Sequence, residues 1–326
     1  MEFYQGSFEE VPAGTGDWAI TLGTFDGVHR GHVAIVQECR SQVRAKGLVG
    51  TCAVSFAMHP RSILVGKRAP RILSSLEEKT TLLREAGVDK LVILDFDASL
   101  ASLAYDTFVR ELLSKRLGLA HFVLGHDVHF GRDRGGNLQT VAALAEADGF
   151  GMSQVASIRH DGEPISSTRI RDLISSGEIE HATKLLGHAP ILPATVVEGQ
   201  RIGRTLGFPT ANLEGLVGAR LLPASGVYSG WLQVEGGASW LGCVLNIGVR
   251  PTVESAGALT VEAHVLDGSH ELYGRRVALA LQGRIRPEQR FATLDELREQ
   301  IAADTLSARH KLDGLSPLAV AALQVV

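Results

Sequence analysis

Cysteine is scarce in this chain of 326 residues, which contains only three. Cys39, Cys52 and Cys243 lie far apart and form no C-x-x-C pair, so the sequence predicts neither a disulfide framework nor a structural zinc site. The cysteine content therefore indicates a protein of a reducing compartment, and we expect a cytoplasmic location.

Long apolar runs are also absent, and so is an amino-terminal targeting segment. No apolar run approaches the roughly 20 residues that a membrane-spanning helix needs. The chain begins MEFYQGS, which has neither the basic start nor the apolar centre of a secretory signal. We therefore expect a soluble, unprocessed protein with no membrane partner.

Charge of one sign is not in large excess. The 32 lysines and arginines nearly balance the 36 aspartates and glutamates, which gives a formal net charge of −4. Binding to a nucleic-acid backbone favours a basic surface, so we do not expect nucleic acid as the main partner. Local clusters of arginine and histidine can still bind small phosphates, and the composition leaves the oligomeric state open.

The chain is longer than most single-core proteins, which predicts two domains. Up to about residue 157, apolar strands alternate with helices, which predicts an α/β domain with a parallel sheet covered by helices. From Ala194 onward, short strands separated by turns predict an antiparallel barrel. Because His188–Pro193 has the character of a linker, we expect domains at residues 1–187 and 188–326.

The expected elements can be given by residue. Ser74 or Ser75 is the expected N-cap of one helix and Gly87 its end. In the first half the strands are Trp18–Leu22, Val49–Phe56, Leu91–Leu94, His121–Leu124 and Met152–Ser157, and the helices are Gly31–Lys46, Leu76–Ala86, Tyr105–Leu117, Val141–Ala147, Ser166–Ser176 and Glu178–Leu186. In the second half the strands are Ala194–Val197, Gly226–Val234, Ser239–Ile247, Leu259–Leu266 and Arg276–Leu281, and the helix is Leu294–Leu306.

A candidate phosphate site follows the first expected strand, in the segment GTFDGVHRGH at residues 23–32. Ligands bind at the carboxyl ends of the strands in a parallel sheet of this kind, and a helix N-terminus attracts anions. The glycines let the backbone approach a ligand. His29 and His32 share one side of the helix start and can stabilise charge on a phosphate in the transition state. The alternative is a pair of surface histidines among turn glycines.

A second phosphate-binding element is predicted at residues 165–171, in the segment ISSTRIR that opens a helix. Thr168 and Arg171 are three residues apart and therefore share a helix face. A hydroxyl, a guanidinium and a helix N-terminus can together grip a triphosphate. The alternative is an ordinary capped helix with solvated arginines.

The second half contains a candidate magnesium site in the segment GFPTAN at residues 207–212. Thr210 and Asn212 are two residues apart, so an extended chain directs both side chains to one side. Hydroxyl and amide oxygens suit Mg²⁺, which takes further oxygens from water and phosphate. The upstream segment Gly199–Arg204 can close over phosphates as a loop. The alternative for the Thr210 segment is a simple turn.

A candidate general base lies in the alternating segment LTVEAHVL at residues 259–266. Glu262 shares one strand face with Thr260 and His264, while the apolar residues between them face the other way. A carboxylate in this position can accept a proton from a substrate hydroxyl. The alternative is the outward polar face of a barrel strand.

The first half resembles the FMN adenylyltransferase module of bacterial bifunctional riboflavin kinase/FAD synthetases, which are Rossmann-like nucleotidyltransferases of the HxGH type. The matching segments are residues 23–32, His59-Pro60, 75–79, 125–131 with Arg134 and Gly136, and 165–171. The resemblance implies transfer of AMP from ATP to FMN, with His29 and His32 catalytic. It places ATP against Gly23, Phe25, Asp26, Gly27, Gly31, Ser167, Thr168 and Arg171, and FMN near His59 and Asp127.

The second half resembles the riboflavin kinase module of the same family, a six-stranded antiparallel β-barrel with a terminal helix. The matching segments are residues 203–212, 226–228, 246–252, 261–264, 272–274 and 286–291. The resemblance implies phosphorylation of riboflavin by ATP, with Glu262 as the general base. It places Mg²⁺ against Thr210 and Asn212, the ATP phosphates against Gly199, Gly203 and Arg204, and the flavin near Asn246 and Arg286.

Departures from the family pattern fall at positions expected to border the ligands. Val128 and His129 replace an aromatic and a basic residue of the first module, and Val253 and Gly268 replace two aromatics of the second. We expect a bifunctional enzyme that makes FMN and then FAD from riboflavin, ATP and Mg²⁺. The alternatives are a riboflavin kinase with weak or absent adenylyltransferase activity and a flavin-binding protein without turnover.

Overall fold

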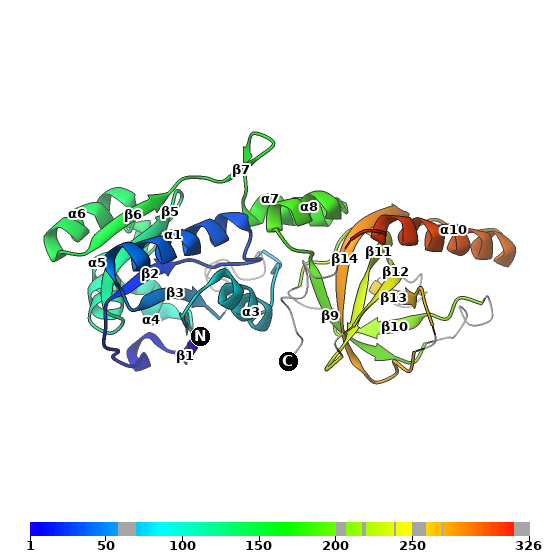
Figure 1. Cartoon of the computed structure of the whole chain (residues 1–326), viewed down its shortest axis with the longest axis horizontal. Helices are drawn as coiled ribbons and strands as arrows, with labels where there is room; N and C mark the ends of the chain where they lie inside the picture. The colour runs from blue at the N-terminus through cyan, green and yellow to red at the C-terminus, as the bar shows by residue number, and fades with distance from the viewer. Residues whose placement is uncertain are drawn as a thin grey trace. The chain divides into compact units, whose positions relative to one another are not determined.

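The structure, a computed structural model, describes residues 1–57, 70–199, 207–216, 220–237, 239–249, 259–268 and 270–315. The chain divides into two compact units, Met1–Ser166 and Ser167–Val326 (Figure 1). This packing boundary precedes the helices α7 (Ser167–Ser176) and α8 (Ile179–Leu186). The functional boundary expected after residue 187 stays a prediction, because a division by packing need not coincide with a division by activity.

The first unit is built on a six-stranded parallel sheet in the order β1-β4-β3-β2-β5-β6. This arrangement confirms the predicted α/β fold and adds the edge strand β1, whose short polar sequence EFYQG gave no strand signal. The strands are β1 (Glu2–Gly6), β2 (Trp18–Leu22), β3 (Gly50–Phe56), β4 (Lys90–Leu94), β5 (Leu119–Gly125) and β6 (Gly151–Val155), and the helices are α1 (Arg30–Lys46), α3 (Leu76–Ala86), α4 (Ala98–Ser102), α5 (Tyr105–Phe108), the π-helical η3 (Val109–Ser114) and α6 (Leu138–Asp148).

Helices cover both faces of this sheet because strand residues alternate between two apolar clusters. Trp18, Ile20 and Leu22 of β2 face a large cluster that includes residues of α4, α5, η3 and α6. Ala19 of the same strand packs with Cys39 of α1 on the opposite face. The loops that follow β2, β3 and β5 therefore leave the sheet together at its carboxyl edge, between the two helix layers.

The second unit contains a closed antiparallel barrel in the order β10-β13-β12-β11-β14-β9, which confirms the predicted six-stranded barrel. The terminal helix α10 (Leu294–Leu312) packs on β11, β12 and β14, and α8 packs on β14. Lys311 of α10 forms an ion pair with Glu180 of α8 at 2.8 Å. The strands are β9 (Ile191–Val197), β10 (Ala211–Glu214), β11 (Gly226–Val234), β12 (Trp240–Val249), β13 (Leu259–Val265) and β14 (Arg276–Pro287).

Two segments differ from the sequence-based expectations. Ile191–Pro193, predicted as part of a linker, begins β9 instead, because that strand pairs with both β10 and β14 to close the barrel. The helix expected over Tyr105–Leu117 is α-helical only to Phe108 and continues as η3. The wider turn of η3 keeps the chain helical while changing which residues share a face.

The three cysteines are free and buried. Burial raises the pKa of the Cys52 thiol to about 12, so this thiol stays protonated and unreactive near neutral pH. Within the part of the chain that the structure describes, no helix combines the length and the apolar character needed to cross a membrane.

Candidate functional sites

The loop Gly23–His32 leaves the sheet at the carboxyl end of β2 and enters α1. It turns sharply, with φ of 47° at Phe25, 80° at Gly27 and 36° at Val28. Positive φ is costly for phenylalanine and valine, and these two side chains are only 1% and 2% exposed. Apolar packing therefore holds a strained turn at the predicted phosphate site.

Asp26 braces this loop from one side. Its buried carboxylate accepts hydrogen bonds from the backbone N–H groups of Leu73 at 2.9 Å and Ser74 at 3.1 Å. The Ser74 hydroxyl in turn accepts from the N–H of Gly27 at 2.9 Å. Asp26, which the resemblance places against ATP, thus ties the loop to the segment that precedes α3.

His29 and His32 lie against each other at the start of α1. The Nδ1 atom of His29 caps the helix by accepting from the N–H of His32 at 3.3 Å, and the two rings stack with centroids 3.7 Å apart. Gly31 makes room for this arrangement, because a Cβ there would come within 3.1 Å of the His29 ring. Among the described residues, no group forms a hydrogen bond with the buried Nδ1 of His32. The pair predicted from the sequence is therefore present at a helix N-terminus.

Burial and the neighbouring His29 and Lys79 hold the pKa of His32 well below its ordinary value. The imidazole is therefore neutral at neutral pH. Lys79 was not among the predicted site residues, although the sequence contained a signal for it. It lies on the same stripe of α3 as the buried Leu82, Leu83 and Ala86, and a lysine among core positions is unusual.

The other residues predicted for this site come from three other segments of the chain. Asp127 lies in the loop after β5, at the same sheet edge, with its side chain 80% exposed. His59 lies outside the described residues. Ser167, Thr168 and Arg171 occupy the first two turns of α7 in the second unit, so their approach to the loop stays a prediction.

Strand register on the barrel brings the predicted kinase residues into one row. Asn212 of β10 pairs with Glu262 of β13, which pairs with Asn246 of β12. Paired residues of adjacent antiparallel strands project to the same face, here the face opposite the buried Val261. Thr210 donates its hydroxyl to Oε2 of Glu262 at 3.4 Å. The predicted metal ligands and the predicted base therefore converge.

The glycine-rich segment before β10 reaches the same row at its first residue. A Cβ at Gly199 would collide with the side-chain amide of Asn212, so the backbone at Gly199 passes directly beside this predicted metal ligand. Gly203 and Arg204 lie outside the described residues.

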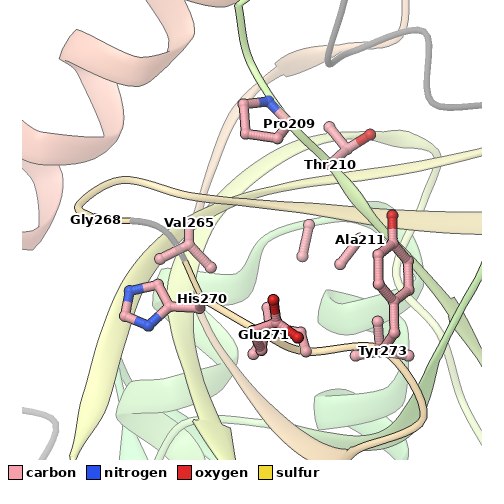
Figure 2. A pocket seen from close by; sticks show the side chains of 11 residues that line it. Pro209, Thr210, Ala211, Val265, Gly268, His270, Glu271 and Tyr273 are labelled. Atoms are coloured by element: carbon pink, nitrogen blue, oxygen red, sulfur yellow. The ribbon is translucent and has the colours of Figure 1, made fainter.

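A pocket of about 290 Å³ adjoins Thr210 (Figure 2). Pro209, Thr210 and Ala211 form one side of it, and His270 and Tyr273 line it from the segment between β13 and β14. Its wall combines aliphatic surface with a hydroxyl, an imidazole, a phenol and the carboxylate of Glu271, and a mixture of apolar and polar groups is typical of small-molecule sites. The pocket was not predicted, because its two sides are far apart in the sequence.

Arg286, predicted to lie near the flavin, is held by a carboxylate of α10. Its Nε and Nη2 atoms donate to the buried Asp304 at 2.8 to 3.1 Å, and Gln300 donates to the same carboxylate at 2.9 Å. The guanidinium also lies 5.6 Å from the ring centroid of Phe291. A bidentate pair of this kind fixes the orientation of the arginine.

Comparisons with known proteins agree with the family resemblance of each half of the chain. A family model described as FAD synthetase matches residues 12–169, and one described as riboflavin kinase matches residues 186–312. A bifunctional riboflavin kinase/FMN adenylyltransferase of Pseudomonas fluorescens is 38% identical over 89% of this chain and 91% of the relative. The protein of the same description from Escherichia coli K12 has the same identity and coverage.

A solved structure from Streptococcus pneumoniae, described as a macrolide-efflux protein, is similar to this chain over nearly its whole length. It matches with a TM-score of 0.86 and 26% identity over 97% of this chain and 100% of the other. The description of that protein names a different activity, so this similarity is evidence for a shared fold and not for a shared activity.

Proposed function

This chain belongs to the family of bifunctional riboflavin kinase/FMN adenylyltransferases, and from this premise we propose which of its residues perform each reaction. The enzyme phosphorylates riboflavin with ATP to give FMN and ADP. It then transfers AMP from a second ATP to FMN, giving FAD and diphosphate. We assign the first reaction to the barrel and the second to the parallel-sheet unit.

The kinase reaction is assigned to the row Asn212–Glu262–Asn246 and the adjoining pocket. The 5′-oxygen of the ribityl chain attacks the γ-phosphorus of ATP, and ADP leaves. Glu262 accepts the proton that this hydroxyl loses. The pocket beside Thr210 is suited to the base of ATP, with the phosphates directed toward Thr210 and Gly199. The convergence of Thr210 with Glu262, at 3.4 Å, is the observation that supports this assignment.

Magnesium fits the residues present at this row. Thr210 and Asn212 supply a hydroxyl and an amide oxygen beside a carboxylate, a set of hard donors that suits Mg²⁺. These two residues would hold the ion, with Gly203 and Arg204 of the adjoining loop near the phosphates. Bound there, Mg²⁺ would neutralise the charge of the ATP phosphates.

The adenylyl transfer is assigned to the loop Gly23–His32. A phosphate oxygen of FMN attacks the α-phosphorus of ATP and diphosphate leaves, so no side-chain nucleophile is needed. His29, His32 and the N-terminus of α1 stabilise the charge that develops on the phosphate. Ser167, Thr168 and Arg171 would grip the triphosphate, and His59 and Asp127 would border the flavin.

A chromatographic time course of the purified protein with riboflavin, ATP and Mg²⁺ tests the assignment of two coupled activities. We expect FMN to appear first and FAD to follow with a lag, because FMN is the substrate of the second reaction. Addition of a chelator in excess of Mg²⁺ should stop FMN formation. Accumulation of FMN without FAD at high ATP would instead indicate that the Val128 and His129 departures disable the first unit.

A further inference from the structure

A lysine is buried beside the phosphate loop of the first unit. Lys79 is 7% exposed, on the core-facing stripe of α3. Its Nζ atom donates to the Ser55 hydroxyl at 3.4 Å and to the Phe56 carbonyl at 3.2 Å, both at the carboxyl end of β3. Burial of an ammonium group is costly unless it is hydrogen-bonded or paired, so this lysine requires an explanation beyond packing.

A directed chain of hydrogen bonds runs from this ammonium to the loop. The fully buried Ser55 accepts from Lys79 and donates its own hydrogen to the carbonyl of Thr24 at 3.1 Å. Asp26 holds the loop from the other side, through Leu73 and Ser74. The backbone from Thr24 to Asp26 is therefore fixed at two points, by the Ser55 hydroxyl that Lys79 bonds and by the Asp26 carboxylate, and the strained turn at Phe25 lies between them.

The same lysine acts electrostatically on the histidine pair. Its positive charge lowers the pKa of His32, together with burial and the neighbouring His29. Burial lowers the pKa of Lys79 itself, and the nearby Asp26 opposes that change. Among the described residues, the titratable groups that act on the pKa of His32 are His29, the N-cap of α1, and Lys79 on α3, while Asp26 acts on Lys79.

We propose that Lys79 is a positioning residue of the adenylyl-transfer site, where it fixes the phosphate loop through Ser55 and Thr24 and holds a positive charge beside His32. This inference rests on the assignment of the loop to adenylyl transfer. The fixed loop keeps the N-terminus of α1 in place for the α-phosphate of ATP. The buried charge helps to hold His32 in its neutral form.

The test compares Lys79→Met, Lys79→Arg and the control Lys115→Met in the full-length enzyme. Lys115 is exposed in the same unit and pairs with the exposed Glu111 one turn away. We expect Lys79→Met to lower kcat for FAD formation from supplied FMN by about tenfold to a hundredfold. FMN formation from riboflavin should be unchanged in all three variants, and Lys115→Met should match the wild type in both reactions.

The pH dependence separates an electrostatic role from simple damage to the fold. In Lys79→Met, the acid limb of the pH–rate profile for FAD formation and the NMR titration of the His32 ring should both move upward by roughly one unit. Lys79→Arg should keep both near their wild-type positions because it keeps the charge. Unchanged titration and unchanged kcat in Lys79→Met would overturn the proposal.

Two further variants keep the test decisive. Ser55→Ala breaks the hydrogen-bond chain but leaves the charge, so we expect a lower kcat for FAD formation with the His32 titration unmoved. Wild-type kcat in Ser55→Ala would overturn the loop-fixing role even if Lys79→Met fails to fold. His32→Ala reports on the premise: if it still makes FAD at the wild-type rate, the site assignment itself is wrong.

Discussion

Asp26 illustrates how a single carboxylate in a phosphate-binding motif can serve the backbone of the site. Both of its oxygens lie within hydrogen-bond distance of the Leu73 N–H, at 2.9 and 3.1 Å, and one also accepts from Ser74. A carboxylate committed in this way is a weak candidate for direct contact with the anionic phosphates of ATP. Its effect on catalysis would instead act through the shape of the loop.

We therefore predict that Asp26→Asn destabilises the first unit by about 1–3 kcal/mol, because an amide places N–H groups against backbone donors and loses a charged acceptor. Chemical denaturation followed by circular dichroism measures this change. Asp133→Asn is the matched control, since the side chain of Asp133 is 92% exposed. A raised KM for ATP without any loss of stability would contradict this interpretation and favour direct ligand contact.

At the scale of elements, a hydrogen-bonded chain joins α1 to the edge of the sheet. Lys46 of α1 bonds Nδ1 of His121 on β5 at 2.8 Å, and Nε2 of His121 bonds Ser153 on β6 at 3.0 Å. The Ser153 hydroxyl donates to Glu38 of α1 at 3.0 Å. A side chain at Gly151 would collide with His121. The chain runs from a cation to a carboxylate and requires a neutral imidazole at its centre.

This arrangement predicts that the first unit loses stability in mild acid. Burial, and then the charge of Lys46, lower the pKa of His121 in the folded protein. The unfolded chain therefore binds a proton more readily, so the free energy of unfolding should fall as the pH drops from the ordinary histidine value of about 6.5 toward the lowered folded value.

Denaturant titrations between pH 7.5 and 5 measure this dependence. His121→Phe should show a shallower decline than the wild type across that window, because one of the histidines with a lowered pKa has been removed and His32 remains. His129→Phe, at an exposed position of the same unit, should leave the slope unchanged. Equal slopes in the wild type and His121→Phe would exclude His121 as the source.

At the scale of the whole molecule, the two candidate sites share no residue. The loop and histidine pair belong to Met1–Ser166, and the row on the barrel belongs to Ser167–Val326. A substitution in one site should therefore abolish the reaction of that site and leave the reaction of the other site intact. The product of the barrel reaction is nevertheless the substrate of the other, which links the two activities through FMN.

We predict that His32→Ala lowers FAD formation at least about 100-fold while FMN formation continues. Glu262→Ala should lower FMN formation by a similar factor and still make FAD when FMN is supplied. Product chromatography with riboflavin or FMN as the starting flavin measures both rates, and each variant is the control for the other. Loss of both reactions in either folded variant would contradict the assignment of separate sites.

Local sequence signals determined the type of most elements and the identity of the principal motifs. The helix α3 has the predicted bounds, with a capping box at Ser75 and a left-handed end at Gly87, because caps and apolar spacing act within a few residues. Strand–helix alternation and the loop after β2 were likewise predictable, since a parallel sheet directs such loops to its carboxyl edge.

Only the tertiary structure decided which distant residues meet. The register of β10, β13 and β12 places Asn212, Glu262 and Asn246 in one row, and barrel closure extends the expected strand Ala194–Val197 back into the expected linker, to Ile191. The roles of Lys79 and Asp304 depend on partners across the fold, at Ser55 and Arg286. Such contacts are set by packing and register between separate elements, which no local pattern of residues encodes.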